Sequence, residues 1–292
     1  MPRRGLGPVE GWLVRTGGVV GFVKGCFHPL PRLVYTPRLL HGRKTWAPRP
    51  QAVAAMTRCF DFPVPVADPE AADLVSPLEA AENLMRGECS TRACRAGRLL
   101  VSLLEAAVGE VGVTGGLAYS PRSAGDVDLV VYGWRAAERA YEALRELRER
   151  GITEPHLAGG HGWSRSDEAL HSRLAAQRLL FGRLNGVEYN VRLVPCTRPV
   201  PCTRVRSLGR GRAAGVVCSA VGYTTPAYYR VCGDQGAVLV VTHRLRYMEI
   251  PVGSRVEVEG SLQEVCGMRV LTPDHGGRVS VAALPGDGGG VG

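Results

Sequence analysis

The order of elements between residues 111 and 132 constrains this chain more than any other feature. A short strand is predicted to end at Gly115-Gly116, a polar loop follows, and a second strand is predicted to start at Asp126. Because side chains alternate along a strand, Asp126 and Asp128 are expected to share one face. The apolar residues between and after them are expected to point into a core. The motif therefore presents two carboxylates next to a flexible glycine turn.

Two neighbouring carboxylates repel each other unless a cation lies between them. Magnesium prefers oxygen ligands and is commonly held by one or two carboxylates together with substrate phosphates. The pair could also anchor a two-metal site for displacement at phosphorus. Gly115 and Gly116 let backbone N–H groups approach phosphate oxygens closely. The motif thus predicts a metal–triphosphate site, in which Arg122 of the loop is a further candidate for phosphate contact.

The run Thr114-Gly115-Gly116, nine intervening residues and Asp126-Val127-Asp128 resembles the motif of the polymerase-beta-like nucleotidyltransferase superfamily. The resemblance implies that Asp126 and Asp128 bind the catalytic divalent metal, with magnesium expected and manganese the alternative. It also implies that Thr114, Gly115 and Gly116 contact a nucleoside triphosphate such as ATP. Together with the runs 25–29 and 32–34, the chain looks like the uncharacterised archaeal predicted nucleotidyltransferases over about residues 10–200.

The chain departs from this pattern at two places. Gly116 stands where many members have serine, so no hydroxyl is available there. The family usually has a third carboxylate on a later strand, and Glu188 is the candidate for that metal-binding and catalytic role. If the strand register instead places Asn190 beside the aspartates, the base is missing. A structural reading also remains open, in which Asp126 caps a turn and Asp128 is a surface strand residue.

The predicted fold class is α+β, a nucleotidyltransferase-like mixed sheet with flanking helices. Four regions are expected: a basic N-terminal β unit (1–50), the nucleotidyltransferase-like domain (51–205), a small β-barrel-like domain of OB type (206–284) and a disordered tail (285–292). The first region contains a hairpin around Gly17-Gly18. Helices are predicted over 90–108, 134–150 and 166–181, a proline-broken helical connector over 51–89, and a strand over 187–194.

The positive charge of the chain is concentrated at its start. The net charge is +9, and residues 1–50 hold nine Lys or Arg residues against the single acid Glu10, which makes +8. Such a segment is either a solvated surface or a face that binds phosphates of RNA or another nucleic acid. Both readings remain open from the sequence.

The nine cysteines are scattered and none forms a C-x-x-C pair, so they are interpreted as small buried hydrophobes. A disulfide between Cys196 and Cys202 fits the spacing, but a cytosolic redox state argues against it. No apolar run approaches the length of a membrane span, and no secretory signal is present. A cytoplasmic protein without membrane contact is expected.

The leading hypothesis is a magnesium-dependent nucleotidyltransferase that moves a nucleoside monophosphate from a triphosphate to an unknown acceptor, with RNA as one candidate. Asp126 and Asp128 would hold the metal, and Glu188 would orient or deprotonate the acceptor. The alternative is a non-catalytic nucleotide- or RNA-binding protein on a degenerate transferase fold.

Overall fold

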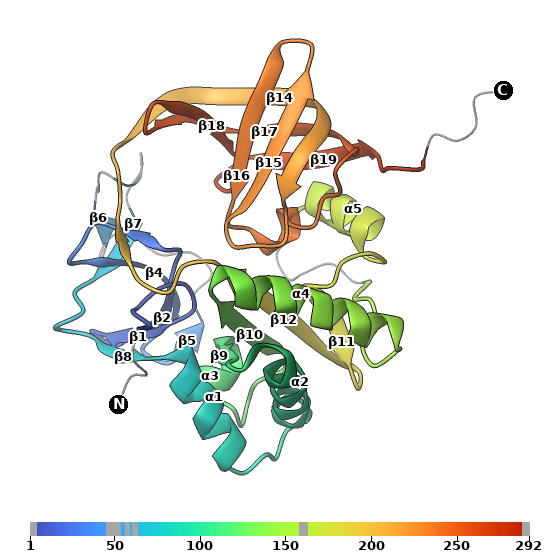
Figure 1. The fold of residues 1–292 in the computed structure, drawn as a ribbon. Coiled ribbons are helices and arrows are strands. Elements are labelled where there is room, and N and C mark those ends of the chain that lie inside the picture. The colour runs from blue at the N-terminus through green and yellow to red at the C-terminus, as the bar shows by residue number, and fades with distance from the viewer. Residues whose placement is uncertain (1–4, 45–53, 56–58, 60–63, 158–162, 288–292) are drawn as a thin grey trace. The chain divides into compact units, whose positions relative to one another are not determined.

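The structure, a computed structural model, describes residues 5–44, 54–55, 59, 64–157 and 163–287. Within these residues the chain is α+β, with five α-helices and several β-sheets (Figure 1). None of the helices in this described part combines the length and apolar character that a membrane crossing needs. The chain divides into two compact units, Met1–Glu154 with Phe181–Arg204 and Pro155–Leu180 with Val205–Gly292. These units differ from the predicted domains, because the N-terminal β region belongs to the same unit as the glycine–aspartate motif.

The N-terminal part of the first unit forms an antiparallel sheet with the order β6-β7-β4-β2-β1-β8, and β5 pairs with β4. The strands are β1 (Leu13–Thr16), β2 (Val19–Val23), β4 (Leu33–Leu40), β5 (Arg43–Lys44), β6 (Ala54–Ala55), β7 (Val64–Ala67) and β8 (Asp73–Val75). The predicted hairpin is confirmed, since β1 and β2 pair antiparallel on either side of Gly17-Gly18. One face buries a core that includes Trp12, Val14 and Tyr35. β3 (Phe27–His28) pairs instead with β13 (Val200–Pro201).

The connector over residues 51–89 was predicted as helical, and this is wrong for the part before Pro77. The described residues there form β6, β7 and β8, which extend the N-terminal sheet. The run Ser76-Pro77-Leu78-Glu79 predicts a helix start with proline in the first position, and α1 (Pro77–Arg86) begins there. Ser76 accepts a hydrogen bond from the Leu78 backbone N–H and so caps the helix. Pairing with strands far along the chain has outweighed the local preference of the earlier residues.

The second sheet of this unit has the order β11-β12-β10-β9. Its strands are β9 (Gly112–Thr114), β10 (Val127–Tyr132), β11 (Phe181–Leu184) and β12 (Val187–Val194). β10 and β12 run parallel, while β9 and β11 pair antiparallel with their neighbours. The sheet is therefore mixed, as predicted, and β12 has the predicted bounds.

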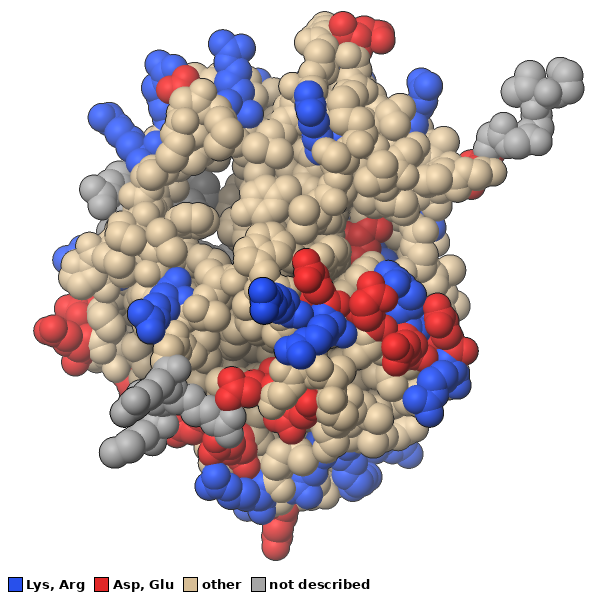
Figure 2. All heavy atoms as spheres, viewed as in Figure 1, with Lys and Arg blue, Asp and Glu red and all other residues tan. Residues whose placement is uncertain are grey.

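The helices α2 (Arg92–Val108) and α4 (Trp134–Glu149) contact each other and the strands β10 and β12 (Figure 1). They bury the apolar face of the sheet against side chains such as Leu100, Leu104 and Leu144. Over α4 acidic and basic side chains are interspersed on the surface (Figure 2), which is typical of a solvated helix face. The other face of the sheet carries the two aspartates, preceded by the short helix α3 (Gly115–Tyr119).

The second unit contains α5 (Arg165–Leu174), the short 3-10 helix η1 (Leu245–Tyr247) and a mixed sheet with the order β14-β15-β16-β18-β17-β19. The strands are β14 (Val205–Val221), β15 (Ala227–Gly233), β16 (Gly236–Thr242), β17 (Arg255–Val265), β18 (Met268–Thr272) and β19 (Arg278–Ala283). β14 also pairs with β17, so the sheet closes on itself. β16 and β18 run parallel and the other pairs are antiparallel.

Several predictions for this region were incomplete. The sequence predicts strands here over 216–223, 237–242, 256–260 and 268–271. The first strand instead begins at Val205, and β15 and β19 were not predicted. The helix predicted over 166–181 ends at Leu174 and groups with the C-terminal strands rather than with the transferase-like domain. The glycine-rich loop at 159–162 and the tail from residue 288 onward lie outside the described residues.

The interpretation of the cysteines as unpaired hydrophobes was wrong. In the described structure the disulfides are Cys26–Cys196, Cys59–Cys202, Cys89–Cys94 and Cys218–Cys232, and Cys266 is a free, exposed thiol. Cys196 and Cys202 do not pair with each other. Each bonds to a cysteine more than a hundred residues earlier, which spacing along the sequence cannot reveal.

Candidate active site

Gly115 and Gly116 lie directly against the two aspartates. Gly115 has φ +61°, and a Cβ placed there would overlap the Asp128 carboxylate. A Cβ on Gly116 would be 3.3 Å from the Cβ of Ala124 and 3.9 Å from Oδ1 of Asp126. Both the backbone conformation and the space therefore require glycine at position 115. The motif residues that are separated in sequence form one compact turn around the carboxylates.

The cross-strand neighbours of Asp128 are Thr114 on one side and Asn190 on the other. The register aligns Asp128 with Thr114 of β9 and with Asn190 of β12. The Asn190 amide Nδ2 donates a hydrogen bond to Oδ1 of Asp128, with a distance of 3.3 Å. Asn190 therefore stands beside Asp128, whereas Glu188 is a neighbour of the other aspartate, Asp126.

Asp126 is half-buried and precedes the first residue of β10. Its pKa is raised to about 6, first by burial and then by the negative charge of Asp128, with a smaller contribution from Glu188. Lys44 acts in the opposite direction. Ionisation of both carboxylates is therefore unfavourable without a cation, and a divalent metal bound between them would remove this repulsion.

Glu188 is an exposed residue of β12. It directly precedes Tyr189, which is aligned with Val127 of the parallel strand β10. Its charge influences Asp126, so it is a neighbour of that carboxylate. Within the described residues, however, no three His, Cys, Asp or Glu side chains are arranged to hold a metal ion together. The donor set that fits magnesium is the carboxylate pair, which would leave the other positions to waters and phosphate oxygens.

Thr114 and Arg122, the other two predicted nucleotide-binding residues, lie in different environments. The Thr114 side chain is buried, and its hydroxyl donates a hydrogen bond to the Gly11 carbonyl at 2.8 Å. It therefore joins the motif to the N-terminal sheet. Arg122 is exposed on the loop before Asp126.

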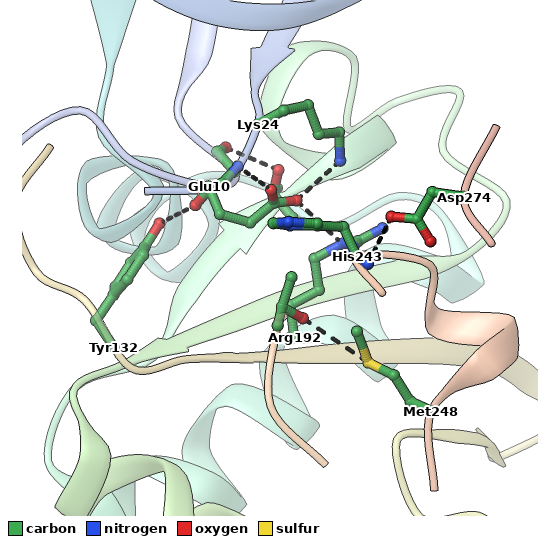
Figure 3. Close-up of polar contacts among 11 residues, drawn as sticks. Glu10, Lys24, Tyr132, Arg192, His243, Met248 and Asp274 are labelled. Carbon is green, nitrogen blue, oxygen red and sulfur yellow. Dashed lines mark hydrogen bonds and ion pairs between the residues drawn. The ribbon is translucent and has the colours of Figure 1, made fainter. Parts of the chain in front are cut away.

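Sequence reasoning missed a charge cluster around the buried Glu10, in which Lys24 and Arg192 pair with its carboxylate (Figure 3). The Glu10 carboxylate is 1% exposed, and it accepts hydrogen bonds from Lys24 Nζ at 2.8 Å and from the Gly25 backbone N–H at 2.6 Å. Arg192 Nε is 3.5 Å from the same carboxylate. The Tyr132 hydroxyl donates to the Glu10 carbonyl at 2.7 Å.

The electrostatics of this cluster follow from its burial. Burial alone would raise the pKa of Glu10, but Lys24, Arg192 and the Gly25 N–H lower it to about 2. Burial and Arg192 lower the pKa of Lys24 to about 8, although Glu10 acts against them. The sequence held one signal of this cluster, since Glu10 is the sole acid in a strongly basic segment.

Comparison with known proteins gives no relative from which a role could be transferred. No protein-family model matches the chain, and no curated protein matches it. Function must therefore be inferred from the arrangement of these residues.

Proposed function

We propose that this protein is a magnesium-dependent nucleotidyltransferase that transfers a nucleoside monophosphate from a triphosphate such as ATP to an acceptor hydroxyl. The observation that carries the proposal is the glycine turn against the aspartate pair, with Gly115 in contact with Asp128 and the pKa of Asp126 raised. Glycine lets the backbone of the turn lie directly against the Asp128 carboxylate. Backbone N–H groups of such a turn can approach phosphate oxygens that share a metal ion with this carboxylate.

The residues would divide the work as follows. Asp126 and Asp128 would hold magnesium, with manganese as the alternative ion, and the metal would neutralise charge on the transferring phosphoryl group. The Asn190 amide fixes one oxygen of Asp128, so the carboxylate keeps its orientation. Glu188 would accept the proton of the acceptor hydroxyl, since its charge reaches Asp126 from the exposed side of the sheet. Arg122 would contact phosphate from the loop.

The finer fold assignments support this proposal. The strand–glycine turn–helix–strand order, with α2 and α4 behind the sheet, supports the proposal of a nucleotidyltransferase-like domain. The closed path β14-β15-β16-β18-β17-β14 supports the OB-type barrel predicted for the C-terminal region. RNA is the first acceptor to test, because OB barrels bind oligonucleotides and because Arg32, Arg38 and Arg43 are exposed.

The cytoplasmic location stays a prediction. Disulfides persist mainly in oxidising compartments and in the intracellular proteins of hyperthermophiles. The pairs found here therefore weigh against an ordinary reducing cytoplasm.

The second candidate is a non-catalytic nucleotide- or RNA-binding protein. Asn190 supports it, because an amide stands beside Asp128 where a third carboxylate would complete the metal site. Both candidates bind a triphosphate, and they differ in turnover.

The test is incubation of the full chain with magnesium and α-labelled nucleoside triphosphates in the presence of RNA, protein and small-molecule acceptors. We expect label transfer by wild type and its loss in Asp126→Asn and Asp128→Asn. The matched control is Asp234→Asn, an exposed aspartate of the C-terminal unit, which should transfer at the wild-type rate. Magnesium-dependent triphosphate binding without transfer to any acceptor would favour the second candidate.

A further inference from the structure

The segment before the N-terminal sheet lies beside β10 and β12, next to the part of these strands that carries Asp128 and Asn190. Along β12, Arg192 follows Asn190 by two residues and so lies on the same face, about 7 Å further along the strand. Arg192 is aligned with Val130 of β10, two residues after Asp128. Gly11 covers this position, because a Cβ there would be 3.6 Å from both the Val130 side chain and the Thr114 hydroxyl. The Glu10–Gly11 segment therefore forms a wall beside the carboxylates.

This wall carries excess positive charge. Glu10 is a single buried acid, and two cations, Lys24 and Arg192, share it. Their side chains keep 29% and 20% of their surface exposed, whereas the Glu10 side chain keeps 1%. Among the described residues, Glu10 is the acid paired with these two cations, so one positive charge at this edge of the site is left in excess. An anion at this edge would supply the missing charge.

The loop that carries Lys24 is held firmly against the sheet. The Gly25 N–H donates to Glu10, and Cys26 is joined by a disulfide to Cys196, just beyond β12. Cys26 is also buried in a small cluster with Val130 and Val194. Phe22, on the preceding strand, packs against Tyr119 of α3, with ring centroids 6.2 Å apart. Lys24 is therefore positioned relative to both the glycine turn and β12.

We propose that Lys24 and Arg192 bind the β- and γ-phosphates of the nucleoside triphosphate, and that Glu10 is the positioning residue that holds both cations. This inference rests on the proposed function and deepens it. The N-terminal sheet then belongs to the nucleotide site and is not a separate module for the acceptor. A triphosphate whose α-phosphate meets the metal at Asp126 and Asp128 extends along the sheet to this wall. Its terminal phosphates are the part that a nucleoside monophosphate lacks.

The test compares binding of a non-hydrolysable Mg–ATP analogue and of AMP to the full chain by calorimetry. Lys24→Gln should weaken binding of the ATP analogue about tenfold or more, as for a lost charge-assisted hydrogen bond, and should change AMP binding less than twofold. Lys24→Arg should restore most of the affinity. Arg139→Gln is the matched control, because it removes one positive charge from an exposed position in the same unit. It should leave both affinities within twofold.

A measurement on the wild-type protein covers the case in which Lys24→Gln does not fold. Lys24 and Lys44 are the two lysines of the chain, so acylation of each can be followed by peptide mass spectrometry. The Mg–ATP analogue and inorganic tripolyphosphate should each protect Lys24 from acylation, and AMP should not.

The two proposals fail in different ways. If the analogue binds in a manner that depends on Asp126 and Asp128, but Lys24→Gln binds it as wild type does or Lys24 is not protected, the role of the wall is refuted and the transferase proposal stands. If wild type binds no triphosphate with magnesium present, the proposed function is refuted and this inference with it.

Discussion

Replacement of Glu10 by Gln should destabilise the first unit by about 3 kcal/mol. The pKa of Glu10 falls from 4.5 to about 2 in the folded protein, and 2.5 pKa units at 1.36 kcal/mol each give roughly that free energy. Independent experience with buried ion pairs gives a similar figure, about 3–5 kcal/mol when one partner is removed. The cause is the same in both cases, because the partly buried Lys24 and Arg192 would lie beside a neutral amide.

The assay is urea unfolding followed by tryptophan fluorescence at pH 7, with disulfides intact. With a slope of about 2 kcal/mol per M, the loss corresponds to a midpoint about 1.5 M lower. Asp73→Asn is the matched control in the same sheet. It breaks an exposed pair with Arg15 at 2.9 Å and should cost less than about 1 kcal/mol.

The pH dependence of the difference provides a sharper check. Because the folded pKa of Glu10 is depressed, its contribution is complete above the unfolded pKa of 4.5 and is lost as the pH falls toward about 2. The gap between wild type and Glu10→Gln should therefore shrink over this range. A loss below 1 kcal/mol at pH 7, or a gap that is constant down to pH 2.5, would refute the account of the cluster.

Four further predictions concern the site and its support. Asp126→Asn should raise the melting temperature at pH 8, where the ionised carboxylate is repelled by Asp128, and should remove the stabilisation by magnesium; a lower melting temperature would contradict the charge argument. In wild type, magnesium should stabilise the fold at pH 8 and lose this effect as the pH falls through about 6, which thermal unfolding at several pH values checks. Gly115→Ala should cost at least 1–2 kcal/mol, for the left-handed backbone alone, and abolish magnesium binding in calorimetry, whereas Gly125→Ala, with open space around it, should be nearly neutral. Removal of Cys26–Cys196 by the double serine variant should cost about 2–5 kcal/mol in urea unfolding and weaken binding of the ATP analogue; unchanged binding would show that the loop is held without it.

The parts of the fold that could be predicted are those determined by neighbouring residues. The hairpin at Gly17-Gly18, the start of α1 at Ser76 and the bounds of β12 follow from turn residues, capping and alternation. The closed barrel path could be anticipated only as a set of strands. The pairing of β14 with β17 joins residues far apart along the chain, such as Val205 with Val265, and a local pattern does not contain this information.

The candidate site divides in the same way. Asp126 and Asp128 and the glycines are linked by a short loop, so their spacing alone predicted that they come together, and the structure places them in contact. The neighbour of Asp128 could not be predicted, since a shift of the register by two residues exchanges Glu188 for Asn190 on the same face.

The sequence by itself determined the carboxylate pair and its glycine turn, because side-chain alternation and the freedom of glycine act over a few residues. Only the tertiary structure decided which groups surround that pair. Glu10 meets Arg192, and Cys26 meets Cys196, across more than 160 residues of chain. These contacts form when apolar faces pack together and buried charges pair. Hydrophobic burial and ion pairing depend on proximity in space and not on separation along the chain.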